Sequence, residues 1–192
     1  MSKLKWKPGT MVYPVPPVMV SCGDMETSNI LTIAWTGIIC TDPAMTYISI
    51  RKERYSYDII KSKGEFVINL ASSDLARAVD FCGVKSGRSI DKFKECNLTK
   101  EAATEVSAPM IKECPINIEC RIKEIKELGT HDMFMAEILA VNVDDKYLDE
   151  TGKFDMEACD LLAYSHGRYY SLGKSLGKFG FSVEKKKSVN KK

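Results

Sequence analysis

Two arginines three positions apart, Arg51 and Arg54, stand between a strand-like segment and a helix start at Ser56. Guanidinium groups form paired, charge-assisted hydrogen bonds, and the free N–H groups of a helix start add oriented dipoles, so together they suit a phosphate. Asp58, in the first helical turn, opposes a second anion there. The alternative is an exposed charged loop in which Ser56 only caps the helix. The pattern therefore supports either a phosphate site or a capped surface loop.

The strand that precedes this region ends in small residues and an aromatic ring. Ala34 and Gly37 permit a ligand to approach the backbone closely, and Thr36 adds a hydroxyl group. A ligand ring system with a polar rim fits against such a strand, because free backbone N–H and C=O groups can meet that rim. Trp35 would then wall the pocket, whereas the usual place of a strand tryptophan is the core.

Motifs for other chemistries are absent or incomplete. No G-x-G-x-x-G fingerprint of a dinucleotide-binding fold occurs. The glycine-rich run at residues 173–179 has the wrong spacing for a P-loop and ends in Phe179, where Ser or Thr is required. Neither His131 nor His166 has a partner at a metal-ligand spacing. We therefore expect His131 to be solvated in a hairpin loop and His166 to lie in a turn. With no nucleophile motif either, we expect no catalytic side chain and no metal.

The hydrophobic pattern predicts many short strands. They are expected at residues 18–22, 29–39 with a break at Gly37, 45–51, 66–70, 116–123, 133–143, 161–164 and 169–172. Residues 128–132 join two of them as a hairpin. In the 116–123 strand, Asn117, Glu119, Arg121 and Lys123 alternate with apolar residues, which predicts one solvent-exposed face.

Only two helices are predicted with clear ends. One begins at Ser56 and ends at Gly64, and the other begins at Ser73 and ends at Gly83. The fold class is therefore mainly β with a few helices, arranged as a closed or split antiparallel barrel.

Length and composition predict one globular domain. The chain has 192 residues, of which 44% are apolar and 28% charged, as in ordinary globular proteins. We place the domain at residues 1–184 and expect a disordered basic tail at residues 185–192, which hold five lysines and no acid. The net charge is +2 for the whole chain and −3 without the tail. An acidic body disfavours a broad nucleic-acid surface.

The seven cysteines are odd in number and show no C-x-x-C spacing. The chain opens without an apolar signal segment, and no apolar run reaches membrane-spanning length. These features predict a cytoplasmic protein whose thiols are mostly small buried hydrophobes. Cys82 is the cysteine most worth testing for reactivity, but a helix C-terminus raises a thiol pKa, so an inert thiol is expected.

Four motifs in order resemble the flavin reductase-like, or flavoredoxin, family of FMN-binding split barrels. They are N-x-x-T-x-A-W-x-G at residues 29–37, S-x-R-x-x-R-x-S at 49–56, F-V-x-N at 66–69 and L-G-x-x-L-G-x-F-G at 172–180. The likeness extends over nearly the whole chain. One departure is Asp42-Pro43 in place of the Pro-Pro of many relatives, which adds a charge to that turn.

The resemblance implies a Greek-key split β-barrel that binds FMN non-covalently, usually as a homodimer with flavin near the subunit interface. Carried over by position, Asn29, Arg54 and Ser56 would hold the phosphate, and Ser49 and Arg51 would lie near the ribityl chain and phosphate. Thr32, Ile33, Ala34 and Thr36 would run along the isoalloxazine ring with Trp35 beside it, and Tyr170 and Lys174 would close the pocket.

Such a protein would cycle bound flavin between redox states. The favoured function is an NAD(P)H-linked flavin reductase or oxidoreductase, and the alternative is an electron carrier between redox protein partners. A third hypothesis is a nucleic-acid-binding β-barrel that uses the lysine tail as an arm. The acidic body and the lack of an aromatic stacking platform weigh against it, so no nucleic-acid partner is expected.

Overall fold

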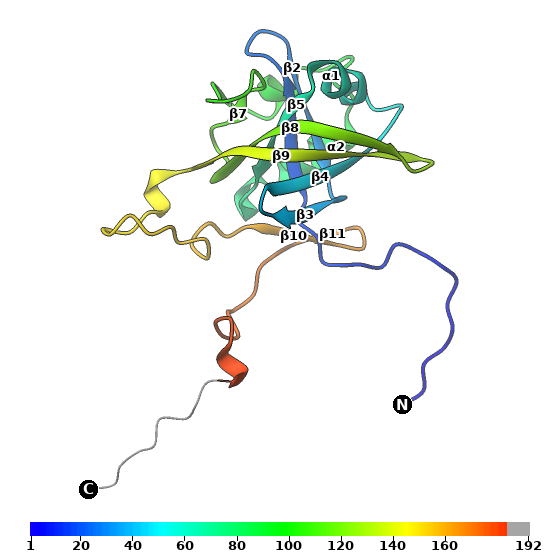
Figure 1. The fold of residues 1–192 in the computed structure, drawn as a ribbon, viewed down its shortest axis with the longest axis vertical. Helices are drawn as coiled ribbons and strands as arrows, with labels where there is room; N and C mark the ends of the chain where they lie inside the picture. Colours follow the sequence, from blue (N-terminus) through cyan, green and yellow to red (C-terminus); the bar gives the residue numbers. More distant parts are fainter. Residues whose placement is uncertain (184–192) are drawn as a thin grey trace, which may run out of the picture.

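The computed structural model describes residues 1–183, so the predicted basic tail at 185–192 lies outside the described residues. Seven strands form the main sheet: β1 (Val18–Gly23), β2 (Ser28–Ile33), β3 (Thr36–Thr41), β4 (Ala44–Arg51), β5 (Glu65–Leu70), β8 (Ile116–Glu127) and β9 (His131–Val143). Two small sheets pair β6 (Lys100–Glu101) with β7 (Met110–Ile111) and β10 (Leu162–Ser165) with β11 (Arg168–Ser171). The α-helices are α1 (Tyr55–Lys63), α2 (Ala76–Val84) and α3 (Lys92–Glu95), and the short 3₁₀ segments are Ser73–Leu75, Asp145–Tyr147 and Phe181–Val183. The mainly β class is thereby confirmed (Figure 1).

The main sheet is antiparallel throughout, in the order β2-β1-β5-β8-β9-β4-β3. Although β2 and β3 follow each other in the chain, they lie at opposite ends of that order, and only residues 34–35 connect them. The Ser49 N–H of β4 donates to the Trp35 carbonyl over 2.9 Å, so the sheet curls until its two ends approach each other at this link. The two ends are not joined into a closed barrel.

The predicted strands form, with one change in position. β4 shows the expected alternation, with Thr46, Ile48 and Ile50 buried on one face. The break in the predicted 29–39 strand falls at residues 34–35 rather than at Gly37, which is inside β3 and pairs with Tyr47. A Cβ atom at Gly37 would lie 3.2 Å from the Tyr47 ring, so the glycine accommodates a cross-strand ring and does not end the strand.

Both helix starts differ from the prediction. The residue that caps α1 is Arg54, and Ser56 lies buried inside the helix, where its hydroxyl accepts a hydrogen bond from Asn29. Near the second helix, residues 73–75 form a 3₁₀ turn and α2 begins only at Ala76. The end of α1 at Gly64 is confirmed, with a positive φ of 72°. α2 ends at Val84, one residue beyond the expected Gly83.

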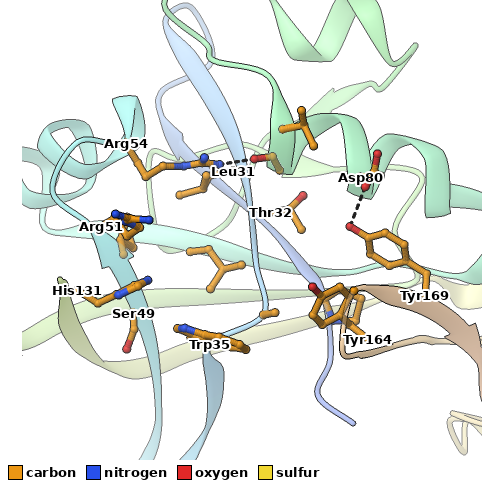
Figure 2. A pocket seen from close by; sticks show the side chains of 17 residues that line it. Leu31, Thr32, Trp35, Ser49, Arg51, Arg54, Asp80, His131, Tyr164 and Tyr169 are labelled. Atoms are coloured by element: carbon orange, nitrogen blue, oxygen red, sulfur yellow. Dashed lines mark hydrogen bonds between the residues drawn. The ribbon is translucent and has the colours of Figure 1, made fainter. Parts of the chain in front are cut away.

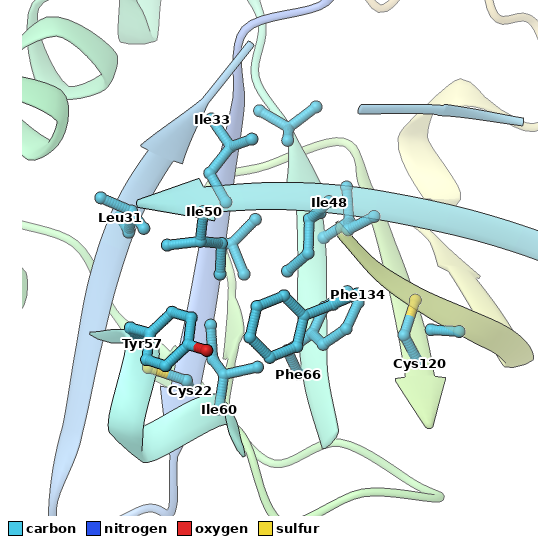
Figure 3. Packing of buried hydrophobic residues seen from close by; sticks show 14 residues of the cluster. Cys22, Leu31, Ile33, Ile48, Ile50, Tyr57, Ile60, Phe66, Cys120 and Phe134 are labelled. Carbon is cyan, nitrogen blue, oxygen red and sulfur yellow. The ribbon is translucent and has the colours of Figure 1, made fainter. Parts of the chain in front are cut away.

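Two apolar clusters hold the sheet. The first packs α1 against the inner face of the curled sheet and includes the fully buried rings of Phe66 and Phe134 (Figure 3). The second lies on the other face of β1 and β2, where Met19 and Ile30 contact Val79 of α2 and neighbouring residues of α3. β1 and β2 are therefore covered on both faces, which explains their nearly continuous burial.

The predicted solvent-exposed face of β8 is confirmed at Arg121 and Lys123, which are exposed, but it is wrong at Asn117 and Glu119, which are both buried. Residues 104–106 pass over this face and donate three backbone N–H groups to the Glu119 carboxylate, joined by the Asn142 amide. Burial would raise the pKa of Glu119, but these hydrogen bonds lower it below its usual range. Glu119 on β8 thus holds the loop at residues 104–106 in place instead of facing water.

Both terminal segments leave the body beside the β10–β11 hairpin as extended arms (Figure 1). Large apolar side chains on these arms are exposed, including Leu4, Trp6, Leu176 and Phe179. The N-terminal arm is tied to the body by a backbone pair between Val15 and Tyr164. Within residues 1–183, no helix has the length and apolarity needed to cross a membrane.

Candidate functional site

A cleft of about 510 Å³ opens where the two ends of the main sheet approach each other. This volume is in the range of roughly 300–1,000 Å³ that small-molecule sites occupy. Its walls come from β2 and the link to β3, from the end of β4, from α2, and from the β10–β11 hairpin. Lining residues are Pro17, Leu31, Thr32, Ile33, Ala34, Trp35, Ser49, Ile50, Arg51, Arg54, Asp80, Gly83, Val84, His131, Tyr164, Gly167 and Tyr169. Figure 2 shows basic side chains at one end and two tyrosines with Asp80 at the other.

β2 forms one long wall of the cleft. It is the end strand of the sheet, so its outer edge faces away from β1. The Thr32 hydroxyl donates to the Val79 carbonyl over 2.5 Å and ties the strand to α2. Gly83 packs against the same residue, and a Cβ atom there would lie 3.3 Å from the Thr32 side chain. The strand and helix are therefore held at a fixed separation along the cleft.

Aromatic rings form a second wall. Trp35 contacts Tyr13 of the N-terminal arm with ring centroids 6.1 Å apart, and Tyr13 contacts Tyr164 at the same distance. Tyr169 extends this row at 5.4 Å from Tyr164 and donates its hydroxyl to Asp80 over 3.2 Å. Aromatic rings supply large, rigid apolar area, so this wall suits a flat ligand.

The basic end is built from β4, the start of β9 and the loop before α1. Arg51 pairs across the sheet with His131, which is half-buried and lines the cleft rather than lying in solvent as expected. Burial and the nearby Arg51 lower the pKa of His131, which keeps its ring neutral at pH 7. Arg54 donates to the Gly83 carbonyl at the end of α2 over 2.5 Å. Arg51 is more exposed and forms a 2.7 Å ion pair with Glu53.

A smaller cavity of about 190 Å³ adjoins the basic end and shares Leu31, Arg54 and Val84 with the main cleft. Asn29 donates to the Ser56 hydroxyl inside it, over 2.7 Å. The loop after α2, at residues 85–87, forms another wall of this cavity. A Cβ atom at Gly87 would lie only 2.0 Å from the Asn29 side-chain oxygen. A side chain at position 87 would therefore force the Asn29 amide out of its place in this cavity.

Lys92 of α3 lines the smaller cavity and is buried, with 3% of its surface exposed. Its ammonium group donates to the Ile30 and Cys82 carbonyls over 2.7 and 2.8 Å. Among residues 1–183 no carboxylate forms an ion pair with it. Burial and the positive charge of Arg54 lower the pKa of Lys92 to about 8. A buried charge is costly unless a counter-charge is present, so this cavity favours an anion.

Nine of the residues named from the sequence line the two cavities. They are Thr32, Ile33, Ala34, Trp35, Ser49 and Arg51 in the main cleft, Asn29 and Ser56 in the smaller one, and Arg54 in both. Thr36 lies outside both, because its hydroxyl donates to the Tyr47 carbonyl within the β3–β4 pair. Tyr170 and Lys174 are exposed and line neither cavity. Side chains alternate along a strand, so Tyr169 faces α2 and its neighbour Tyr170 faces away from it.

Sequence reasoning missed several residues of the site, among them Lys92, His131, Asp80, Gly87 and the wall tyrosines Tyr164 and Tyr169. The position of His131 beside the arginine-bearing strand could have been inferred had the β4–β9 pairing been foreseen. Lys92 carries no local signal, because it stands in an ordinary charged run, Lys92–Glu95. Its role depends on the packing of α3 against β2.

Comparison with known proteins agrees with this architecture. Residues 10–173 match the family described as flavin reductase like domain. The flavoredoxin of Desulfovibrio vulgaris (Miyazaki F) is 33% identical, with a TM-score of 0.86 over 95% of this chain and 99% of that one. A flavoredoxin from Methanosarcina acetivorans is 28% identical, with a TM-score of 0.85 over 96% and 100% of the two chains.

A more distant relative, named NADPH-flavin oxidoreductase, comes from Streptomyces viridifaciens. It is 23% identical over 132 residues, which cover 68% of this chain and 67% of that protein. The family match spans most of the chain, and the curled sheet with its cleft has the same fold as the flavoredoxins. The chain therefore belongs to the flavin reductase like family.

Proposed function

We propose that the cleft binds FMN non-covalently and that the protein is a flavin-dependent oxidoreductase. The observation that carries the proposal is the buried ammonium group of Lys92, which lacks a carboxylate partner in residues 1–183. Lys92 lines the smaller cavity, which adjoins the aromatic-walled cleft. FMN joins a phosphate to a flat ring system, so it supplies both the missing counter-charge and a partner for the aromatic wall. In this proposal the curled sheet is a Greek-key split barrel.

Each part of the ligand would meet a different set of residues. Arg54, Lys92, Asn29 and Ser56 surround the smaller cavity and would hold the phosphate. Ser49 and Arg51, at the end of β4, would lie along the ribityl chain. The outer edge of β2 at Thr32 and Ile33, together with the link at residues 34–35, would receive the ring, because unpaired backbone N–H and C=O groups along an edge strand can pair with its polar rim.

Bound flavin supplies hydride and electron transfer, while the protein supplies orientation and electrostatics. The cations at the basic end favour any negative charge that develops nearby on reduction, because fixed charges in a sheltered site need no reorganisation. The cleft needs no side chain as general acid or base for this task. Arg54, fastened to α2 through the Gly83 carbonyl, is well placed to stay ordered.

The reductase assignment is supported by the relative named NADPH-flavin oxidoreductase. The similarity to flavoredoxins favours an electron carrier as the second candidate. A reductase accepts hydride directly from NADH or NADPH, whereas a carrier receives electrons only from a protein partner. Both candidates require the same flavin site.

We also propose that a second copy of the chain covers the terminal arms. Exposed Leu4 and Trp6 on one arm and Leu176 and Phe179 on the other lie on segments that extend away from the body (Figure 1). Large apolar side chains exposed on extended segments are typical of a surface that a partner covers. The N-terminal arm also reaches the cleft wall through Tyr13, so dimerisation would order that wall. Sedimentation of arm-truncated and full-length protein tests this expectation.

The test of the flavin proposal is an absorption spectrum of purified protein reconstituted with FMN, followed by anaerobic addition of NADH or NADPH. A yellow complex that bleaches rapidly on addition supports the reductase. A yellow complex that bleaches only with a redox protein supports the carrier. A protein that stays colourless and shows no binding of FMN in a titration refutes both.

A further inference from the structure

Two cysteines from different helices meet beside the smaller cavity. Cys82 lies near the end of α2, Cys96 directly follows α3, and their sulfur atoms are 4.0 Å apart. Both are free thiols. Cys82 is fully buried, whereas Cys96 is partly exposed at the end of a one-turn helix. A solvent oxidant therefore meets Cys96 first, and Cys82 lies next to it as the second thiol.

The pair is connected to the cations of the smaller cavity through the backbone. The Cys82 carbonyl accepts the ammonium of Lys92, and the next carbonyl, that of Gly83, accepts the guanidinium of Arg54. Lys92 and Cys96 belong to the same short helical segment. A disulfide has a sulfur separation of about 2.05 Å, so bond formation must bring the two sulfur atoms closer by roughly 2 Å. Any part of this approach that the backbone takes up moves Lys92 and the carbonyls that hold both cations.

We propose that Cys82 and Cys96 form a reversible dithiol–disulfide pair that weakens anion binding in the adjoining cavity when it is oxidised. Its effect on FMN rests on the flavin function proposed above. The oxidant is a low-molecular-weight disulfide. The Cys96 thiolate attacks one of its sulfurs, a mixed disulfide forms, and one small thiol leaves. The Cys82 thiolate then attacks the Cys96 sulfur and releases the second small thiol, so two protein thiols are oxidised as one small disulfide is reduced.

A bound anion should in turn affect oxidation of the cysteine pair, because Lys92 lies close to both thiols. Burial raises the pKa of both thiols, that of Cys82 to about 12, while the Lys92 ammonium lowers both. A phosphate bound to Lys92 offsets part of this lowering of the thiol pKa values, so fewer thiolates form and bound FMN slows oxidation of the pair. Binding linkage requires the equilibrium effects to be reciprocal: if the disulfide weakens FMN binding, FMN must disfavour the disulfide.

The test oxidises the full-length protein with excess glutathione disulfide, alkylates the remaining thiols and maps disulfides by mass spectrometry. FMN affinity is measured before oxidation, after it and after dithiothreitol treatment. We expect a Cys82–Cys96 disulfide, a loss of FMN affinity of about fivefold or more, and recovery on reduction. The variant Cys96→Ser should lose both effects. Cys40→Ser, at a partly exposed cysteine on β3, is the matched control and should retain both.

Two results overturn the inference: no disulfide between these residues in the mapped protein, or a disulfide that leaves FMN affinity unchanged. Failure of the flavin proposal gives a different result, since the reduced protein would then bind no FMN before any oxidant is added. Circular dichroism of Cys96→Ser establishes that the variant is folded. The wild-type disulfide map does not depend on any variant.

Discussion

Replacing Lys92 with methionine should change stability and ligand binding in opposite directions. The depression of its pKa from 10.5 to about 8 corresponds to a cost of about 3 kcal/mol for keeping the buried group charged. Methionine removes this cost but leaves the Ile30 and Cys82 carbonyls without a donor, at about 1 kcal/mol each. We therefore expect apo-Lys92→Met to be about 1 kcal/mol more stable than wild type in urea denaturation.

Binding of FMN to Lys92→Met should weaken at the same time. A hydrogen bond to a charged group contributes about 1.5–3 kcal/mol, which is roughly a 10- to 100-fold change in Kd. Fluorescence titration measures this change, and riboflavin, which lacks the phosphate, is the matched ligand and should bind both proteins alike. Lys94→Met, at an exposed position of the same helix, is the control variant and should bind FMN normally.

Two results would refute the reasoning about Lys92. An unchanged Kd for FMN would show that the phosphate does not meet this ammonium group. An equal loss for FMN and riboflavin would show that the substitution disturbs the ring site instead. A large loss of apoprotein stability would contradict the cost assigned to the buried charge.

Three further predictions concern pH and neighbouring positions. Because the unfolded chain holds the Lys92 proton more tightly than the folded chain, apoprotein stability should rise as pH increases from about 8 to 10.5, and FMN affinity should fall over the same range, as urea denaturation and titration at each pH would show. Gly87→Ala should weaken FMN binding about tenfold or more through its 2.0 Å clash with Asn29, whereas Gly173→Ala, with open space around it, should bind normally in the same titration. Glu119→Gln should lower the free energy of unfolding by about 3 kcal/mol at pH 7, since buried backbone donors lose a charged acceptor. In the wild type, the pKa of Glu119 is lower in the folded state than in the unfolded state, so this contribution should be lost as pH falls below 4.5 through the folded-state value. A melting temperature that does not change with pH in this range would contradict the prediction.

Local sequence patterns were sufficient to locate strands that have one apolar face and that end in a defined turn. The alternation in β4 and the β8–β9 hairpin were predictable because strand periodicity and turn residues act over a few positions. Nine of the site residues named from the motifs at 29–37 and 49–56 line the two cavities, since both motifs lie on strands and loops that border the cleft. The family assignment also followed from the order of these motifs.

Other features depend on which segments pack against each other, and local patterns carry no such information. Glu119 looked solvent-exposed because alternation predicts two faces of β8 but not that residues 104–106 cover one of them. Ser56 looked like a helix cap because its hydrogen-bond partner, Asn29, lies far away in the sequence, on β2. Cys82 looked like an isolated buried thiol until α3 brought Cys96 to it.

The chain by itself determined the strand-rich class, the positions of most strands and the cleft residues on β2 and at the end of β4, because these follow from periodicity and from short ordered motifs. Tertiary structure decided where the uncompensated charge lies. Lys92 stands in an ordinary charged run, and only the packing of α3 against β2 and α2 removes its ammonium from water and directs it to two backbone carbonyls. Burial is a property of the assembled fold, and burial turns this lysine into a group that favours an anion.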